Sequence, residues 1–464
     1  MIEKLFKVRE SGSTVKREIY TGLLTFLAVA YILAVNPAIL GATGMDRGGV
    51  LYATALAGFA GGLAMALLAN YPLALAPAMG LNAFFAFTVV KTMGYSWQFA
   101  LFAVFVEGIV FLLLTLCSLR EKIVEAIPLP LKYAMGVGVG LFISLIACKN
   151  GYVVKSHPDT LLTFQNFSKF HTEGISAILA LIGVGITSWL MTLRVNGAIL
   201  VGIIFTWGLG MFCESTGIYH VVPEMGFNSL YPDFSKESFT TPFNGFCGLF
   251  GAAFEVDKWH CTVSGQSGWM LLKSVDFIVV CFAFFFTDFF DTIGTINGAV
   301  VNTPLMKEDG TIPRLRGALL ADSIATFTGG ILGTSTTTTF AESAAGINAG
   351  ARTGLAALTC AVLFLISLVA APIFLAIPGF ATAPALIIVG FLMLKAVVHI
   401  DFSDVAAAVP AYLLIIGTVF TYSISNGLGF GIIAWCVLNF RIKGRVNWLL
   451  WLISMIFIVK YICL

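Results

Sequence analysis

The chain has 464 residues, of which 58% are hydrophobic and only 11% are charged. With a mean hydropathy of +0.95, this composition excludes a soluble domain of useful size. The net charge is +2, and no basic cluster indicates a nucleic-acid partner. Apolar runs of roughly 17–25 residues recur along the chain without alternating, which is typical of membrane-spanning helices and not of a β-barrel. We therefore predict an all-α polytopic membrane protein.

The chain divides into five parts. Residues 1–18 are polar, lack the apolar core of a signal peptide, and are expected to be cytoplasmic. Residues 19–213 and 274–445 each contain seven predicted spans, and the polar stretch 214–273 between them is expected to be an extramembrane loop. Residues 446–464 form an apolar tail, either a further span or an interfacial helix. The fourteen predicted spans cover residues 21–40, 50–69, 73–90, 97–119, 131–147, 175–193, 198–212, 277–300, 317–332, 333–352, 354–376, 381–398, 404–422 and 427–440.

The distribution of positive charge predicts the orientation of these spans. With a cytoplasmic N-terminus, seventeen Lys and Arg residues fall on the inner side and eight on the outer side, and Lys460 in the tail is unassigned. An excess on the inside supports cytoplasmic ends for the fourteen-span core. The same assignment requires the irregular segments near residues 80 and 340 both to cross the membrane.

The two halves resemble each other. Residues 57–63, AGFAGGL, match residues 325–331, ATFTGGI, and an irregular segment follows each. The Ile-Pro pair that ends at Pro128 recurs before a later span as the pair that ends at Pro378. Because seven spans is an odd number, the second copy is inverted relative to the first. Inverted repeats with paired interrupted helices are typical of secondary transporters.

Both irregular segments are predicted to contain a short extended piece followed by a half-helix. Residues 73–82, LALAPAMGLN, contain Pro77, and residues 334–340, TSTTTTF, are rich in β-branched Thr. Such backbone is tolerated at membrane depth only inside protein or beside a water-filled cavity. The half-helices are expected to start near Met79 and Phe340, with positive N-termini facing each other. The alternative is a kinked, continuous helix whose Thr hydroxyls bond to their own backbone.

Ionisable residues inside spans are functional candidates because burying them is costly. Glu342 lies at the start of the second half-helix, and Asn82 holds the corresponding place in the first. Asp288 and Asp291 share one helix face, and two carboxylates in a low dielectric do not easily both ionise, so the pair is a candidate proton-coupling element. Each candidate also has a structural alternative. Glu342 could simply complement the helix dipole, and Asn82 could be an ordinary helix cap. The two aspartates could form inter-helix hydrogen bonds without a role in transport.

The remaining polar residues and motifs do not indicate an enzyme. Glu107 lies inside a span and is expected to pair with another helix. No Walker A sequence and no metal-binding cluster is present in the sequence, so we predict neither an enzyme nor an ATP-driven pump, with no cofactor or metal. The nine cysteines are scattered and are expected to be inert, although a disulfide among Cys213, Cys247 and Cys261 stays open.

Several stretches carry a resemblance to a known family. They are REIYTGLLTFLAVAYILAVNPAIL, ANYPLALAPAMGLNAFFAFTVV, GYSWQ, DFFDTIGT and GTSTTTTFAESAAGINAGARTGL. Over almost its whole length the chain resembles the nucleobase–cation symporter family, of the nucleobase/ascorbate transporter superfamily, in its AzgA-like hypoxanthine/guanine/adenine permease branch.

The resemblance implies two inverted seven-span repeats. Spans 1–4 and 8–11 would form a core domain, and spans 5–7 and 12–14 a gate domain. It also implies a multi-pass protein of the cell membrane that imports adenine, guanine or hypoxanthine by proton symport, with alternating access of core against gate. Asp291, Asp288 and Glu342 would couple protons. The substrate-binding residues it implies are Glu342, Asp291, Asn82, Phe84 (or Phe85), Ala341, Ser343 and Thr339.

Alternatives on the same fold are a carrier of uracil, xanthine, urate or another small anion, and a channel. The expected partners are a purine nucleobase, protons and the lipid bilayer, and a homodimer stays open. The sequence does not distinguish which purine is preferred, or proton from sodium coupling.

Overall fold

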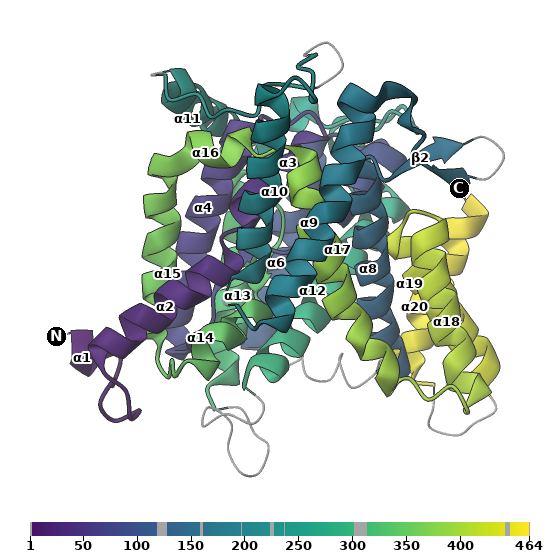
Figure 1. Ribbon diagram of the computed structural model, residues 1–464. Helices are drawn as coiled ribbons and strands as arrows, with labels where there is room; N and C mark the ends of the chain where they lie inside the picture. The colour runs from purple at the N-terminus through teal and green to yellow at the C-terminus, as the bar shows by residue number, and fades with distance from the viewer. Residues whose placement is uncertain are drawn as a thin grey trace.

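The computed structural model shows a mainly helical protein whose long helices run side by side between two faces (Figure 1). Within the described residues, eight helical segments are long and apolar enough to cross a membrane. The protein is therefore a multi-pass membrane protein. The structure describes residues 2–117, 128–157, 161–195, 197–222, 227–235, 237–300, 313–440 and 446–463.

The regular spans predicted from the sequence coincide with helices. Long apolar stretches form helices here because every backbone group is then bonded within its own segment. The helices of the first half are α2 (Val15–Val29), α3 (Ile32–Gly41), α4 (Arg47–Ala64), α6 (Trp97–Leu116), α8 (Leu129–Asn150), α9 (Ile175–Thr192) and α10 (Ala198–Ser215). Those of the second half are α12 (Val275–Val300), α13 (Leu315–Leu332), α15 (Gly354–Ile366), α16 (Ala371–Ala376), α17 (Gly379–Leu394), α18 (Val405–Phe420) and α19 (Ile424–Asn439).

The irregular segments have the predicted extended pieces. Strand β1 (Leu75–Pro77) precedes α5 (Met79–Ala83), which continues as the π-helical turns of η2 (Phe84–Thr92). Strand β4 (Thr337–Thr339) precedes the turn η9 (Ala341–Ser343) and α14 (Ala344–Asn348). The two segments are thus interrupted and not continuous kinked helices, and the half-helices begin where the sequence predicts.

The polar stretch between the halves is partly ordered on one face of the molecule. It contains α11 (Glu237–Leu249), which lies near α16 at the top of Figure 1. Two glycines at the start of α4 let α11 approach closely, since a Cβ on Gly48 would lie 2.7 Å from Pro242 Cα. The thiols of Cys213, Cys247 and Cys261 are all free.

Two features of the periphery complete the fold. A hairpin of β2 (Val154–His157) and β3 (Leu161–Phe164), which the sequence analysis did not predict, lies on the same face as α11 (Figure 1). The apolar tail forms α20 (Trp448–Cys463), which packs along α19. The side chain of Phe457 on α20 is buried, and a Cβ on Gly429 of α19 would lie 2.6 Å from its ring.

Helices α6 and α13 approach each other closely at glycines. A Cβ on Gly108 would lie 2.4 Å from the backbone nitrogen of Phe327, and one on Gly330 would lie 2.9 Å from that of Phe105. Close backbone approach at small residues is a common way for helices to associate in membranes. The contact matters for function because α13 supports β4, as described below.

We expect Gly108→Ala to destabilise the protein by about 1–3 kcal/mol, because the added methyl group meets backbone atoms that cannot move aside. Thermal unfolding of the detergent-solubilised protein measures the effect. The matched control is Gly136→Ala on α8, where nothing lies within 4 Å of the added Cβ. Equal unfolding temperatures for the two variants would contradict the packing assignment.

Candidate substrate site

The site is built around the pairing of β1 with β4. The strands are antiparallel, with Leu75 opposite Thr339 and Pro77 opposite Thr337. The pair is extended by a bond from Phe340 N to the Ala74 carbonyl at 3.0 Å. Because the strands are antiparallel, the two half-helices leave from opposite ends of the pair. Their first N–H groups lie beside the strands and carry partial positive charge.

Glu342 lies at the centre of this arrangement. Its Oε1 accepts a 2.7 Å hydrogen bond from the hydroxyl of Tyr31, which lies at the break between α2 and α3. Asp291 on α12 lies within Coulombic range of both Glu342 and Tyr31. Glu342 and Asp291 are partly exposed, whereas the three Thr residues of β4 are buried. Two acids and a phenol from three parts of the chain therefore converge beside the strand pair.

The Thr run fixes the strand to the helices around it. The Thr336 hydroxyl donates to Glu107 Oε2 on α6 at 2.7 Å, and the Thr339 hydroxyl lies 2.5 Å from that of Thr295 on α12. The inter-helix partner expected for Glu107 is thus the segment that leads into β4. Backbone that is not helical is held here by side-chain hydroxyls as well as by strand pairing.

Asp288 and Asp322 form a second, deeper acidic pair. Both carboxylates are fully buried. The Thr292 hydroxyl lies 3.3 Å from Asp288 Oδ1, 3.0 Å from Asp322 Oδ2 and 2.6 Å from the Thr338 hydroxyl, and Thr338 also donates to Asp322 at 2.8 Å. Thr292 therefore links the two acids to β4. Asp288 and Asp291 occupy different surroundings, although the sequence analysis treated them as a pair.

We expect Thr292→Val to lower stability by about 1–3 kcal/mol, because it removes the shared hydroxyl while both carboxylates stay buried. The readout is the unfolding temperature of the purified protein. Thr206→Val is the control, since the Thr206 hydroxyl donates to the Gly202 carbonyl of its own helix, at 2.8 Å. A Thr292→Val protein as stable as this control would contradict the proposed link.

The other predicted site residues surround the strands and are mostly buried. Asn82 Oδ1 accepts a hydrogen bond from the Ser335 hydroxyl, so it ties α5 to the segment that leads into β4. Ser343 Oγ accepts from Ala74 N at 2.9 Å, and Ala341 is exposed. The Phe84 ring is fully buried and packs edge-on against Phe284, with ring centroids 4.7 Å apart. A stacking role for Phe84 therefore requires its side chain to move.

Three polar residues of this region were missing from the sequence analysis. Asp322 lies in the apolar run LLADSIATF, and the reasoning that selected Asp288 applies to it equally. Asn36 donates to the Thr334 hydroxyl at 2.9 Å, and its position beside Pro37 inside a span was a usable signal. Tyr31 carries no comparable signal, because a tyrosine in an apolar helix is ordinary.

The fold is that of solved membrane transporters. The transmembrane domain of a cyanobacterial bicarbonate transporter, BicA, aligns with a TM-score of 0.59 at 16% identity, covering 90% of this chain and 97% of that one. The structure of SLC26A9 aligns with a TM-score of 0.63 at 11% identity, covering 94% and 68%. At such identities the likeness shows the fold alone. Fold and apolar helices together define a multi-pass membrane protein of this architecture.

Residues 16–430 match the family model Xan_ur_permease, described as a permease family. The chain belongs to this nucleobase/ascorbate family of permeases and is a transporter, not an enzyme. It is 35% identical to the adenine permease AdeP of Escherichia coli K12, over all of this chain and 96% of the relative. It is 38% identical to the guanine/hypoxanthine permease PbuG of Bacillus subtilis 168, over the full length of both.

Proposed function

We propose that the protein is a secondary active transporter that imports purine nucleobases by proton symport. The observation that carries the proposal is the convergence of Glu342, Tyr31 and Asp291 beside the paired strands. The adenine and guanine/hypoxanthine permeases that resemble the chain over its full length support a purine as the substrate.

The chemistry of a purine suits this arrangement. The base is flat and largely neutral, with N–H donors and ring acceptors on its edges. Glu342 Oε1 accepts from Tyr31, so its second carboxylate oxygen can accept from a ring N–H. The first N–H groups of the half-helices can donate to ring acceptors. Few polar groups placed in an otherwise apolar environment are typical of a small-molecule site.

Proton coupling follows from the two acids. Glu342 and Asp291 repel each other when both are ionised in a low-dielectric surrounding. A proton that binds together with the purine removes this repulsion, and the neutralised site can then cross to the other side. We assign the coupling to this pair, with Asp288 in the buried hydroxyl network behind it.

The architecture that we propose has fourteen spans in two inverted repeats, with a cytoplasmic N-terminus. In an inverted repeat, equivalent strands of the two halves run antiparallel, and β1 and β4 pair in this direction. The core domain would hold α2 to α6 and α12 to α16, and the gate domain α8 to α10 and α17 to α19. Alternating access would come from the core moving against the gate.

The decisive experiment is uptake of radiolabelled hypoxanthine, guanine and adenine into cells that lack purine permeases of their own. We expect saturable uptake that rises as the external pH falls and collapses with a proton uncoupler. Competition by uracil, xanthine and urate in excess tests the alternative substrates. Uptake that ignores both pH and uncoupler would rule out proton symport, and unsaturable flux would indicate a channel.

A further inference from the structure

A cleft opens between the ends of α3 and α8. Figure 1 shows α11 and the β2–β3 hairpin on the same face of the molecule, which is the outer face in the proposed orientation. The volume of the cleft is about 500 Å³, within the range of small-molecule sites. One wall comes from α3 and the start of α4, and the other from the end of α8 and the start of α17. The cleft thus lies between the proposed core and gate domains, where a solute from outside must pass.

The described lining of the cleft carries two cations and no carboxylate. Arg47 comes from the start of α4 and Lys149 from the end of α8. Within the part of the chain that the structure describes, Arg47 forms no ion pair. Lys149 lies over the Tyr422 ring, with its Nζ 5.6 Å from the centroid. The Arg47 charge is therefore available to a ligand, whereas the Lys149 ammonium group already contacts an aromatic ring and would have to leave it to bind one.

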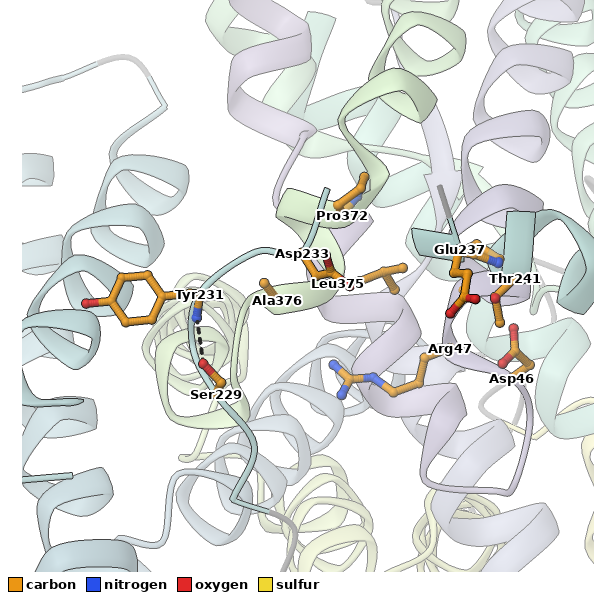
Figure 2. A pocket seen from close by; sticks show the side chains of 12 residues that line it. Asp46, Arg47, Ser229, Tyr231, Asp233, Glu237, Thr241, Pro372, Leu375 and Ala376 are labelled. Atoms are coloured by element: carbon orange, nitrogen blue, oxygen red, sulfur yellow. Dashed lines mark hydrogen bonds between the residues drawn. The ribbon is translucent and has the colours of Figure 1, made fainter. Parts of the chain in front are cut away.

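The orientation of Arg47 strengthens this assignment. Asp46 and Glu237 line a neighbouring cavity of about 430 Å³ that Arg47 also borders. Figure 2 shows the guanidinium group pointing away from both carboxylates. Asp46 is occupied as the cap of α4, accepting from Gly49 N at 2.6 Å. The alkyl stem of Arg47 packs against Gly41, where a Cβ would lie 2.5 Å from Arg47 Cγ, so the stem holds the side chain toward the cleft.

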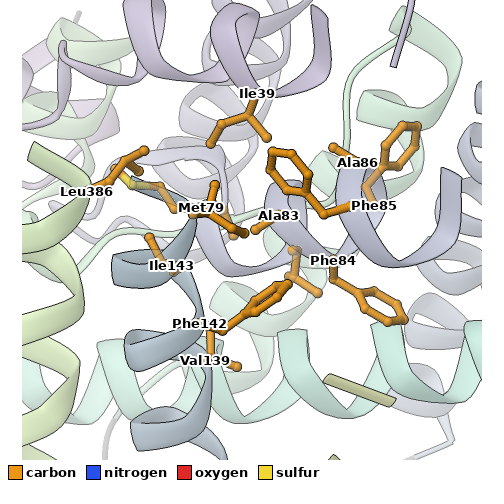
Figure 3. Close-up of a cluster of buried hydrophobic side chains, with 14 of the residues drawn as sticks. Ile39, Met79, Ala83, Phe84, Phe85, Ala86, Val139, Phe142, Ile143 and Leu386 are labelled. Atoms are coloured by element: carbon orange, nitrogen blue, oxygen red, sulfur yellow. The ribbon is translucent and has the colours of Figure 1, made fainter. Parts of the chain in front are cut away.

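Much of the cleft lining is apolar. Ile39 and Leu386 line the cleft and are themselves buried. Figure 3 shows Leu386 near Met79 and Ile143, in the buried cluster to which Ile39 also belongs. A ligand in the cleft would therefore lie above packed apolar side chains.

We propose that this cleft is an outer subsite that selects 6-oxopurines over adenine through Arg47 and Lys149. The proposal rests on the proposed purine transport. The O6 and N7 atoms of guanine or hypoxanthine are two adjacent acceptors, which an arginine contacts with both arms of its fork. The same edge of adenine presents an amino donor beside N7, which a guanidinium group cannot pair with. Tyr152, whose ring stacks on Phe227, brings an aromatic side chain to the lining.

The test measures how strongly each variant binds external hypoxanthine and external adenine. For a base that is transported the measure is its KM, and for a base that only inhibits uptake it is the inhibition constant. For Arg47→Gln we expect the hypoxanthine constant to rise on the order of tenfold, since a bidentate arginine contact discriminates by about that much. The adenine constant should change by less than about twofold. Arg47→Lys should recover part of the loss. Lys155→Gln, on β2 outside the cleft, is the charge-matched control and should change neither constant.

A rise in the hypoxanthine and adenine constants by the same factor, or no change in either, would overturn the subsite. If Arg47→Gln does not fold, Lys149→Gln carries the same test, because its effect must also be larger for hypoxanthine than for adenine. A wild-type protein that transports no purine would refute the proposed function instead. Purine uptake by the wild type with unselective cleft variants would refute only the subsite.

Discussion

Glu342→Gln is expected to reduce kcat/KM for purine uptake by roughly a hundredfold or more at equal expression. The variant keeps the size of the side chain but replaces an ionised acceptor by a neutral amide. Hydrogen bonds to a charged group are worth about 1.5–3 kcal/mol, and here both the bond to Tyr31 and the one proposed to the substrate are weakened. Initial rates of radiolabelled purine uptake, normalised to protein in the membrane, measure the loss.

Two further variants make this result specific to the site. Tyr31→Phe removes only the donor to Glu342, so we expect a smaller loss of about tenfold. Glu173→Gln removes an acid that pairs with Lys169 at 3.3 Å, away from the strand pair, and it should transport normally. Normal uptake by Glu342→Gln would remove Glu342 from the site. Equal losses in Glu342→Gln and Glu173→Gln would point to a general effect of charge.

The helices and the interrupted segments were predictable because their causes are local. In lipid, a long apolar run satisfies its backbone hydrogen bonds by forming an α-helix, so the positions of the helices follow from the positions of the apolar runs. Pro77 and the run of Thr residues also act locally, through a missing donor and through β-branching, and both strands lie where these residues are. Even the starts of the half-helices follow from where these local constraints end.

What the sequence could not predict depends on contacts between distant residues. The register that places Leu75 opposite Thr339 joins positions 264 apart along the chain. The bond from Tyr31 to Glu342 spans 311 residues and has no local pattern. The direction of the Arg47 side chain depends on Gly41 and the cap at Asp46, so its place in the cleft follows only from the packed structure.

Asp291→Asn is expected to abolish purine accumulation while preserving exchange. The amide resembles a carboxyl that always carries its proton, so it can accompany bound purine across the membrane but cannot release a proton inside. Wild-type protein should accumulate more purine as the external pH falls below the internal pH. The variant should show no response to this gradient, yet exchange labelled for unlabelled purine at a rate within about tenfold of wild type. Proteoliposomes with an imposed pH gradient separate the two activities.

Asp288→Asn distinguishes the two aspartates. Asp288 is fully buried, and its oxygens accept from Thr292 at 3.3 Å and Thr326 at 3.5 Å, whereas Asp291 is partly exposed beside Glu342. We therefore expect Asp288→Asn to lower the unfolding temperature while the surviving protein still responds to the pH gradient. Two outcomes would assign the coupling proton to the buried hydroxyl network instead of the substrate site. One is purine accumulation by Asp291→Asn at the wild-type level. The other is a loss of purine accumulation that occurs in Asp288→Asn alone. The two acids lie one helical turn apart, so this pair of variants locates the proton to within that turn.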